Sequence, residues 1–167
     1  MTTSPLSPAE LLYGDFPAEY ATTRRFLERY PDGKGDWRPH ERSRPLALLA
    51  THVADIVNRG TNVIELDGLD LGTRTPLKPM DSVAELVAYY DASLARFIAA
   101  LASTSLDRLE ESWSLRRGTQ IMMQHPRRIL LRLMMMSHLV HHRAQLGVYY
   151  RLLDIPVPGS YGPSADD

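Results

Sequence analysis

Three of the six histidines of this 167-residue chain lie within five positions, in the segment HLVHHRAQL. Residues four apart lie on one face of an α-helix, about one turn apart, so His138 and His142 can direct both imidazoles to one point. Zinc proteases hold their metal ion with a histidine pair of this spacing. Position 139 is Leu and not Glu, so the protease motif is incomplete. The spacing therefore predicts two ligands of a metal site and leaves the reaction open.

The candidate for a third ligand is His52, because two imidazoles alone make a weak site. It lies three residues after Leu49 and four before Ile56, within an apolar helical pattern that directs it inward. Helix bundles commonly build metal sites from side chains on facing helices. Three nitrogen ligands leave coordination positions open, as catalytic sites do. We expect a divalent ion, Zn or Ni first and Mn or Fe next.

Two residues near the histidine pair are our candidates for proton transfer, His141 and Tyr149. His141 lies three residues after His138, where it could be an alternative ligand, a supporting group or a general base. Gln145 and Tyr149 continue the face of His142 by one and two turns, where they could orient a ligand or a bound water.

The composition limits the partners and the ligands. With 19 basic and 20 acidic residues the net charge is −1, so no overall field attracts nucleic acid or an anionic membrane. The length and the 44% of hydrophobic residues suit one domain over residues 1–167. There is no cysteine, so metal ligands must come from His, Asp and Glu, and any thiol from outside the chain. Without a secretory signal or a membrane-spanning stretch in the sequence, we expect a cytoplasmic protein.

The first of four predicted helices lies within residues 7–30. Ser7 and Glu10 have the spacing of a capping box. Pro17 either kinks this helix or marks its true start, with Asp15 as the cap. The sequence leaves both alternatives open.

The other three predicted helices carry the histidines. The second begins near residues 43–45 and contains His52, and the third opens at Ser82, with Glu85 completing a capping box. The fourth runs from about Pro126 to about Leu153 and carries the histidine segment.

The connections decide the topology. Residues 66–80 have no strand pattern, 112–126 read as a loop or a short hairpin, and 154–167 form an extended tail rich in Pro and Gly. Four amphipathic helices without convincing strands predict an all-α four-helix bundle. The long connections 66–81 and 103–125 allow crossovers in place of simple up-and-down order.

Five arginines could bind an anionic substrate, although such residues more often form a solvated face. They are Arg116, Arg117, Arg127, Arg128 and Arg132.

Three stretches of the chain resemble the DinB/YfiT-like family. They are residues 37–56, where His52 matches the first histidine of the family, RGTQI at 117–121, and the last helix and tail at 126–167. The most specific part is the pair of histidines four apart followed by RAQL. The resemblance implies a four-helix bundle with unusual connectivity, often a homodimer, and a divalent metal held by three residues. These ligands fall on His52, His138 and His142. His141 matches a histidine that is common in the family motif and is not usually a ligand.

Two classes of function follow from the resemblance. Some related proteins are transferases or isomerases that use a small thiol such as mycothiol or bacillithiol, and others are described as hydrolases. We therefore expect a metalloenzyme that activates a water or an external thiol, with thiol transfer slightly favoured. The alternative is a non-catalytic, stress-response dimer whose metal ion is closed off by a fourth ligand, for which Asp55 is a candidate. The simplest alternative is a bundle without metal, whose histidines are hydrogen-bonded in the core.

Overall fold

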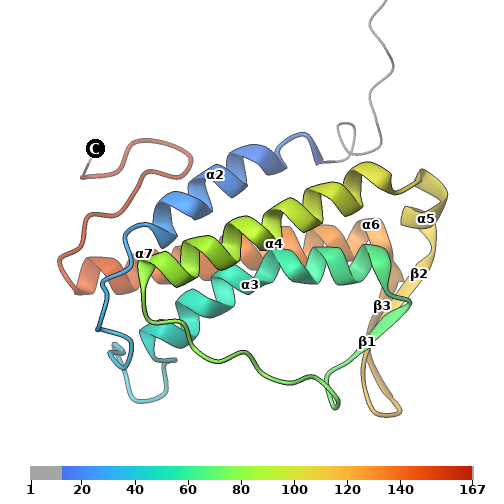
Figure 1. The fold of residues 1–167 in the computed structure, drawn as a ribbon, viewed down its shortest axis with the longest axis horizontal. Coiled ribbons are helices and arrows are strands. Elements are labelled where there is room, and N and C mark those ends of the chain that lie inside the picture. Colours follow the sequence, from blue (N-terminus) through green and yellow to red (C-terminus); the bar gives the residue numbers. More distant parts are fainter. Residues whose placement is uncertain (1–12, 167) are drawn as a thin grey trace, which may run out of the picture.

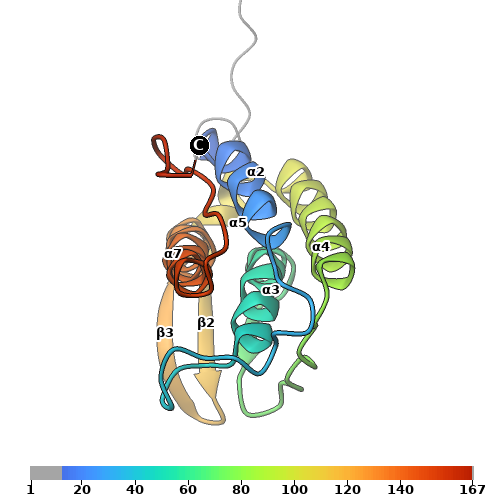
Figure 2. The ribbon, with the colours of Figure 1, turned by 90° about the vertical axis from the view of Figure 1, so that its left-hand side faces the viewer.

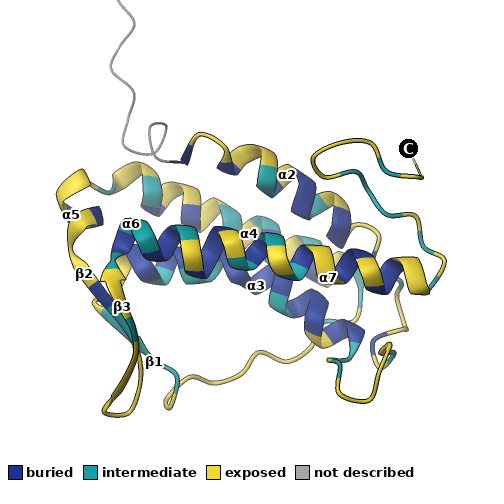
Figure 3. Cartoon of the chain, turned by 180° about the vertical axis from the view of Figure 1, so that it is seen from behind, coloured by how far each residue is buried: buried dark blue, intermediate teal, exposed yellow. Residues whose placement is uncertain are grey.

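Helices make up most of residues 13–166, which are the part of the chain that the computed structural model describes. Four helical segments lie side by side around a shared core, and Figure 2 shows them nearly end on. They are buried where they face one another and exposed on their outer sides (Figure 3). The segments are α2 (Phe16–Leu27), α3 (Leu46–Glu65), α4 (Val83–Ser103) and a composite last helix, α6 (Arg127–Leu130), η1 (Leu131–Ser137) and α7 (His138–Leu152).

A small sheet lies at one end of the helices (Figure 1). Its strands are β1 (Gly68–Asp70), β2 (Ser112–Arg117) and β3 (Gln120–Pro126), in that order, and the short helix α5 (Leu106–Glu110) precedes β2. β1 runs parallel to β2, and β2 and β3 form an antiparallel hairpin. The hairpin turns at Gly118, whose φ of 57° is in the left-handed region that favours glycine.

The sheet corrects the expectation of an all-α fold. The hairpin was one of the two alternatives for residues 112–126, and it is confirmed. The expectation of no strand in residues 66–80 is wrong, because β1 pairs with β2 there. A three-residue strand has too little sequence to show alternation, and β1 forms only because β2 supplies the hydrogen-bonding edge.

The helix starts follow the local signals. Of the two alternatives for the first helix, the later start is confirmed, since α2 begins at Phe16 with Pro17 in its first turn. Asp15 occupies the N-cap position, but its carboxylate makes no capping hydrogen bond and pairs with Arg132 instead. The predicted capping box at residues 7–10 lies outside the described residues. Ser82 caps α4 as predicted, because its hydroxyl accepts from the Glu85 backbone N–H at 3.3 Å.

The last helix has the predicted extent but not a uniform geometry. Its central seven residues, 131–137, form a π-helix, which the sequence analysis did not anticipate. A π-turn holds more residues than an α-turn, so successive side chains are rotated less from one to the next. Met134, Met135 and Met136 are consequently all buried in the core.

α3 is the helix around which the others pack, and it contacts α2, α4, η1 and α7. Gly60 allows the close approach of α4, because a Cβ there would lie 2.5 Å from a carbon of the Phe97 ring. No helix within residues 13–166 has the length and apolar character needed to cross a bilayer.

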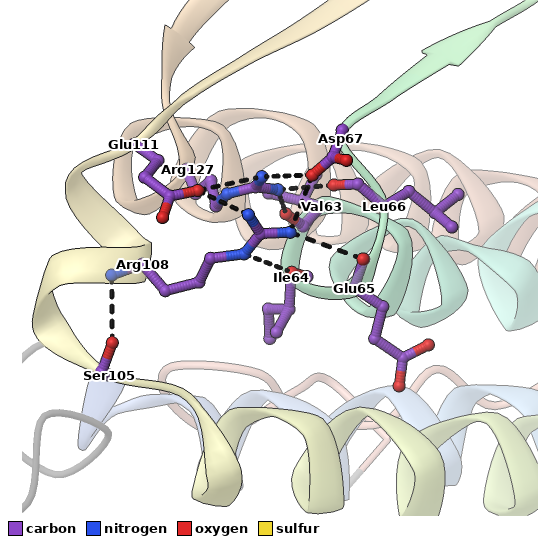
Figure 4. A network of polar contacts seen from close by, with 9 residues as sticks. All are labelled: Val63, Ile64, Glu65, Leu66, Asp67, Ser105, Arg108, Glu111 and Arg127. Carbon is purple, nitrogen blue, oxygen red and sulfur yellow. Dashed lines mark hydrogen bonds and ion pairs between the residues drawn. The ribbon is translucent and has the colours of Figure 1, made fainter.

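Two arginines hold the C-terminal end of α3 (Figure 4). Arg127, which is 1% exposed, donates to two backbone carbonyls at 2.5 and 2.6 Å, and Arg108 donates to a third at 3.3 Å. Both guanidinium groups also pair with the carboxylates of Asp67 and Glu111. The last carbonyls of a helix have no partner within it, so these contacts satisfy groups that would otherwise be orphaned.

Candidate metal centre

The three predicted ligands meet in the structure. His52 comes from the second turn of α3, and His138 and His142 come from the first two turns of α7. One nitrogen from each lies within 4.8 Å of the other two, and the Nε2 atoms of His52 and His138 are 2.9 Å apart. Within residues 13–166 no other group of three His, Asp or Glu side chains is arranged in this way. We refer to these residues as the histidine triad.

The triad has the chemistry that a divalent ion needs. Burial, and then the positive charge of Arg59, lowers the pKa of His52 to about 2 and the pKa of His138 to about 4. Burial also lowers the pKa of His142. All three imidazoles are thus neutral at pH 7, which is the form that binds metal. The 2.9 Å between the Nε2 atoms of His52 and His138 is the length of a hydrogen bond between the two rings, as the alternative without metal expects. Metal–nitrogen bonds of about 2.0–2.1 Å would set ligand nitrogens roughly 3 Å apart, so an ion could take the place of this hydrogen bond with little movement of the rings.

Gln145 favours and Arg59 opposes the tautomer in which the Nε2 atom of a triad histidine can bind an ion. Gln145 Oε1 lies 2.7 Å from His142 Nδ1, so it can accept a hydrogen bond from Nδ1–H and leave the Nε2 lone pair for an ion. A guanidinium nitrogen of Arg59 lies 3.3 Å from His52 Nδ1, and arginine can only donate. This contact places the His52 proton on Nε2. An ion at His52 Nε2 therefore requires the Arg59 guanidinium to move away from Nδ1.

Asp55 does not join the triad as a fourth ligand. Its buried carboxylate accepts hydrogen bonds from Arg74 at 2.5 Å, the Tyr89 hydroxyl at 2.8 Å and the Asn58 amide at 3.2 Å. Both carboxylate oxygens of Asp55 therefore already accept hydrogen bonds within the fold. Among the described residues the candidate site therefore has three protein ligands.

Two cavities flank the triad. The His52 cavity, of about 390 Å³, lies between α3 and the segment 71–77. The His142 cavity, of about 490 Å³, lies between α7 and the residues that lead into α3. Their linings share only Arg44. Both volumes are within the range of small-molecule binding sites.

The two candidates for proton transfer are placed differently, and both remain predictions. Tyr149 lines the His142 cavity, and its hydroxyl donates to the backbone carbonyl of Arg44 at 3.0 Å. His141 is exposed, with its ring centre 4.8 Å from that of His142, and it lines neither of the two cavities.

Of the five arginines that the sequence analysis considered for anion binding, only Arg117 lines a cavity beside the triad. The other four are each paired with acidic groups: Arg116 with Asp70, Arg127 with Asp67 and Glu111, Arg128 with Glu110, and Arg132 with Asp15. They have partners within the fold and do not line these cavities.

The structure adds three arginines near the triad that sequence reasoning missed, Arg44, Arg59 and Arg74. A signal for Arg59 was present, because a residue seven positions after His52 lies two turns along the same helix face. Arg44 and Arg74 lie outside α3, so no periodicity indicated which way they would point.

Comparison with known proteins gives the family. The sequence model of the DinB family matches residues 1–167. A DinB-like protein of Bacillus cereus has a similar fold, with a TM-score of 0.68, 21% identity, and coverage of 91% of this chain and 97% of that one. A DinB-like protein of Bacillus subtilis gives 0.66 and 20%, with coverage of 87% and 95%. None of the curated proteins searched matches this chain. The full-length match and the histidines gathered between α3 and α7 lead to one conclusion: the chain belongs to the DinB family.

Proposed function

We propose that this protein is a metal-dependent enzyme that transfers a small external thiol to a second substrate. The observation that carries the proposal is the pair of cavities, one lined by His52 and the other by His142. Thiol transfer brings two organic molecules to one centre, and each cavity has room for one of them. Hydrolysis needs a cavity for only one substrate besides water.

A divalent ion held by the histidine triad would supply a Lewis acid that lowers the pKa of a neighbouring thiol or water. The chain contains no cysteine, so the sulfur nucleophile has to enter from solution. Its sulfur would bond to an electrophilic carbon of the second substrate, the bond from that carbon to a leaving group such as chloride would break with its electron pair going to the leaving group, and the S–H proton would pass to a base. We propose Tyr149, in the His142 cavity, or His141, beside it, for this proton transfer.

The non-catalytic alternative is favoured less by the geometry. A purely structural ion is normally closed off by four protein ligands. The described residues bring three, and Asp55 is engaged by Arg74, Tyr89 and Asn58. An incomplete protein shell beside two cavities is the arrangement expected of a centre that receives a substrate.

The first test is metal content. Protein purified without a histidine tag is stripped with a chelator, incubated with Zn²⁺, Ni²⁺ or Mn²⁺, and measured by elemental analysis. We expect about one ion per chain in the wild type and loss of the ion in His138→Ala and His142→Ala. His125→Ala is the control, because His125 is exposed on β3 and should leave the content unchanged. A wild type that stays empty with all three ions contradicts the proposal.

The second test is activity. The loaded protein is incubated with an aryl chloride electrophile and a panel of low-molecular-weight thiols, and the conjugate is measured by mass spectrometry. We expect conjugation that requires both the thiol and the ion. Ester hydrolysis that needs no thiol would favour the hydrolase instead.

A further inference from the structure

We propose that the His52 cavity binds the anionic group of a small organic substrate, a carboxylate or a phosphate, and that this anion and the metal ion strengthen each other's binding. Calling the occupant a substrate rests on the proposed function. The binding of the anion does not, and it can be measured on metal-free protein.

The first support is the charge of the cavity. Its lining contains Arg44, Arg74 and Arg117 and a single acidic residue, Asp55, which is paired with Arg74. Arg44 and Arg117 have no carboxylate partner among residues 13–166. A concave surface with unpaired charge of one sign raises the local concentration of the opposite ion. Guanidinium groups bind carboxylate and phosphate through two parallel hydrogen bonds.

The second support is the apolar part of the lining, which comes from Leu48, Leu71, Pro76 and Leu77. Leu48 and Leu77 are 39% and 38% exposed, so they have apolar surface left to cover. Apolar walls with a few polar groups are typical of sites for organic ligands. The cavity therefore fits an anion that carries a short hydrocarbon portion better than an inorganic ion.

The third support is that the cavity wall is anchored. Residues 71–80 run along α3 (Figure 1) without regular structure. Arg74 is tied to the buried Asp55, and the Met80 backbone N–H donates to Thr51 Oγ1 at 2.7 Å. These two contacts hold the segment against α3, so its arginine is positioned before a ligand arrives.

The hairpin that carries Arg117 is anchored to the start of the same segment. Asp70 Oδ1 accepts from the backbone N–H groups of Gly72 at 2.8 Å and Gly118 at 3.0 Å. One carboxylate thus joins the turn after β1 to the turn between β2 and β3. This contact places Arg117, next to Gly118, at the cavity.

The coupling to the metal ion follows from the same charges. A guanidinium nitrogen of Arg59 lies 3.3 Å from His52 Nδ1, and Arg44 lines both the cavity of His52 and the cavity of His142. A divalent cation at the triad would be repelled by these two positive charges. An anion in the His52 cavity offsets this positive charge. By linkage, an anion that tightens metal binding must itself bind more tightly when the metal is present.

The first experiment titrates metal-free protein by calorimetry at fixed ionic strength. The probes are benzoate, phenyl phosphate, inorganic phosphate and the uncharged benzamide. We expect benzoate and phenyl phosphate to bind, inorganic phosphate to bind at least tenfold more weakly, and benzamide not to bind. Equal affinity for phenyl phosphate and inorganic phosphate would overturn the organic part of the proposal.

The variant for this experiment is Arg117→Gln, because Arg117 lines only the His52 cavity whereas Arg44 lines both. We expect about tenfold weaker benzoate binding. Arg96→Gln is the matched control, since Arg96 is an exposed arginine on α4 outside both cavities. No benzoate binding by the wild type, or equal loss in both variants, would overturn the proposal.

The second experiment measures Zn²⁺ affinity by chelator competition with and without saturating benzoate. We expect about tenfold tighter Zn²⁺ binding with benzoate, and a smaller gain in Arg117→Gln. An equal gain in the variant would mean that the anion reaches the ion without the cavity, and it would overturn the coupling. Anion binding by a protein that takes up no metal would contradict the proposed function and leave the anion site standing.

Discussion

Arg59 lies two helical turns after His52 on α3, and one of its guanidinium nitrogens is 3.3 Å from His52 Nδ1. Its charge opposes a cation at the triad, and its donors occupy the nitrogen that must carry the proton when Nε2 binds an ion. In Arg59→Gln the charge is lost and an amide oxygen can accept from Nδ1–H. We expect Zn²⁺ affinity to rise about tenfold, as measured by chelator competition.

Arg59→Lys is the control for this prediction. It keeps the positive charge and offers no acceptor, so it should not tighten Zn²⁺ binding. Weaker binding in Arg59→Gln than in the wild type would show that Arg59 supports the site.

The sequence was sufficient for the triad and insufficient for its surroundings. His138 and His142 share a helix, so their spacing alone put them on one face, and the apolar pattern around His52 turned it toward the core. Arg74 and Arg117 reach the same place through a long connection and a hairpin. Their positions depend on tertiary packing, for which a local pattern contains no signal.

Among the helices, α3 packs closely against α4 at Gly60. A Cβ added at Gly60 would lie 2.5 Å from the Phe97 ring, which is itself fully buried. In Gly60→Ala the two helices must separate or the ring must leave its position. We expect the free energy of unfolding to fall by about 1–3 kcal/mol, as measured by urea denaturation.

The matched control is Gly162→Ala, because a Cβ at Gly162 meets no atom within 4 Å. It should change the free energy of unfolding by less than about 0.5 kcal/mol. If Gly60→Ala were as stable as this control, α3 and α4 would be able to accommodate the added methyl group without loss of folding free energy, and the prediction would be wrong.

The sequence predicted helix boundaries well where a cap or a proline marks them. Ser82 and Pro17 are local signals, and the structure follows both. β1 and the π-helix at 131–137 were missed for a common reason. Neither has a residue pattern of its own, and β1 exists only through its pairing with β2.

For the molecule as a whole, the triad makes the stability of the metal-free protein depend on pH. The pKa of His52 is about 2 and that of His138 about 4 in the folded protein, against about 6.5 in an unfolded chain. Between pH 6.5 and 4 the unfolded chain takes up protons at these positions and the folded chain does not. The contribution of these two histidines to the free energy of unfolding is thus fully present above pH 6.5 and is lost as the pH is lowered.

Urea denaturation in the presence of a chelator, at pH 7 and pH 5, checks this expectation. The wild type should lose more stability between the two values than the His52→Gln/His138→Gln double variant, in which these titrations are absent. The comparison cancels the carboxylates that titrate in both proteins. Equal losses would contradict the lowered pKa values.

The π-helix at 131–137 also determines where the last helix can change in length. A wide turn holds more residues than an α-turn, so a deletion within it can close the helix into continuous α geometry while both ends keep their faces. Arg127 would stay at the end of α3, and His138 and His142 would still face His52. A deletion between those two histidines would rotate one of them by about 100°. A one-residue deletion should therefore be tolerated within residues 131–137 and not tolerated between 138 and 142.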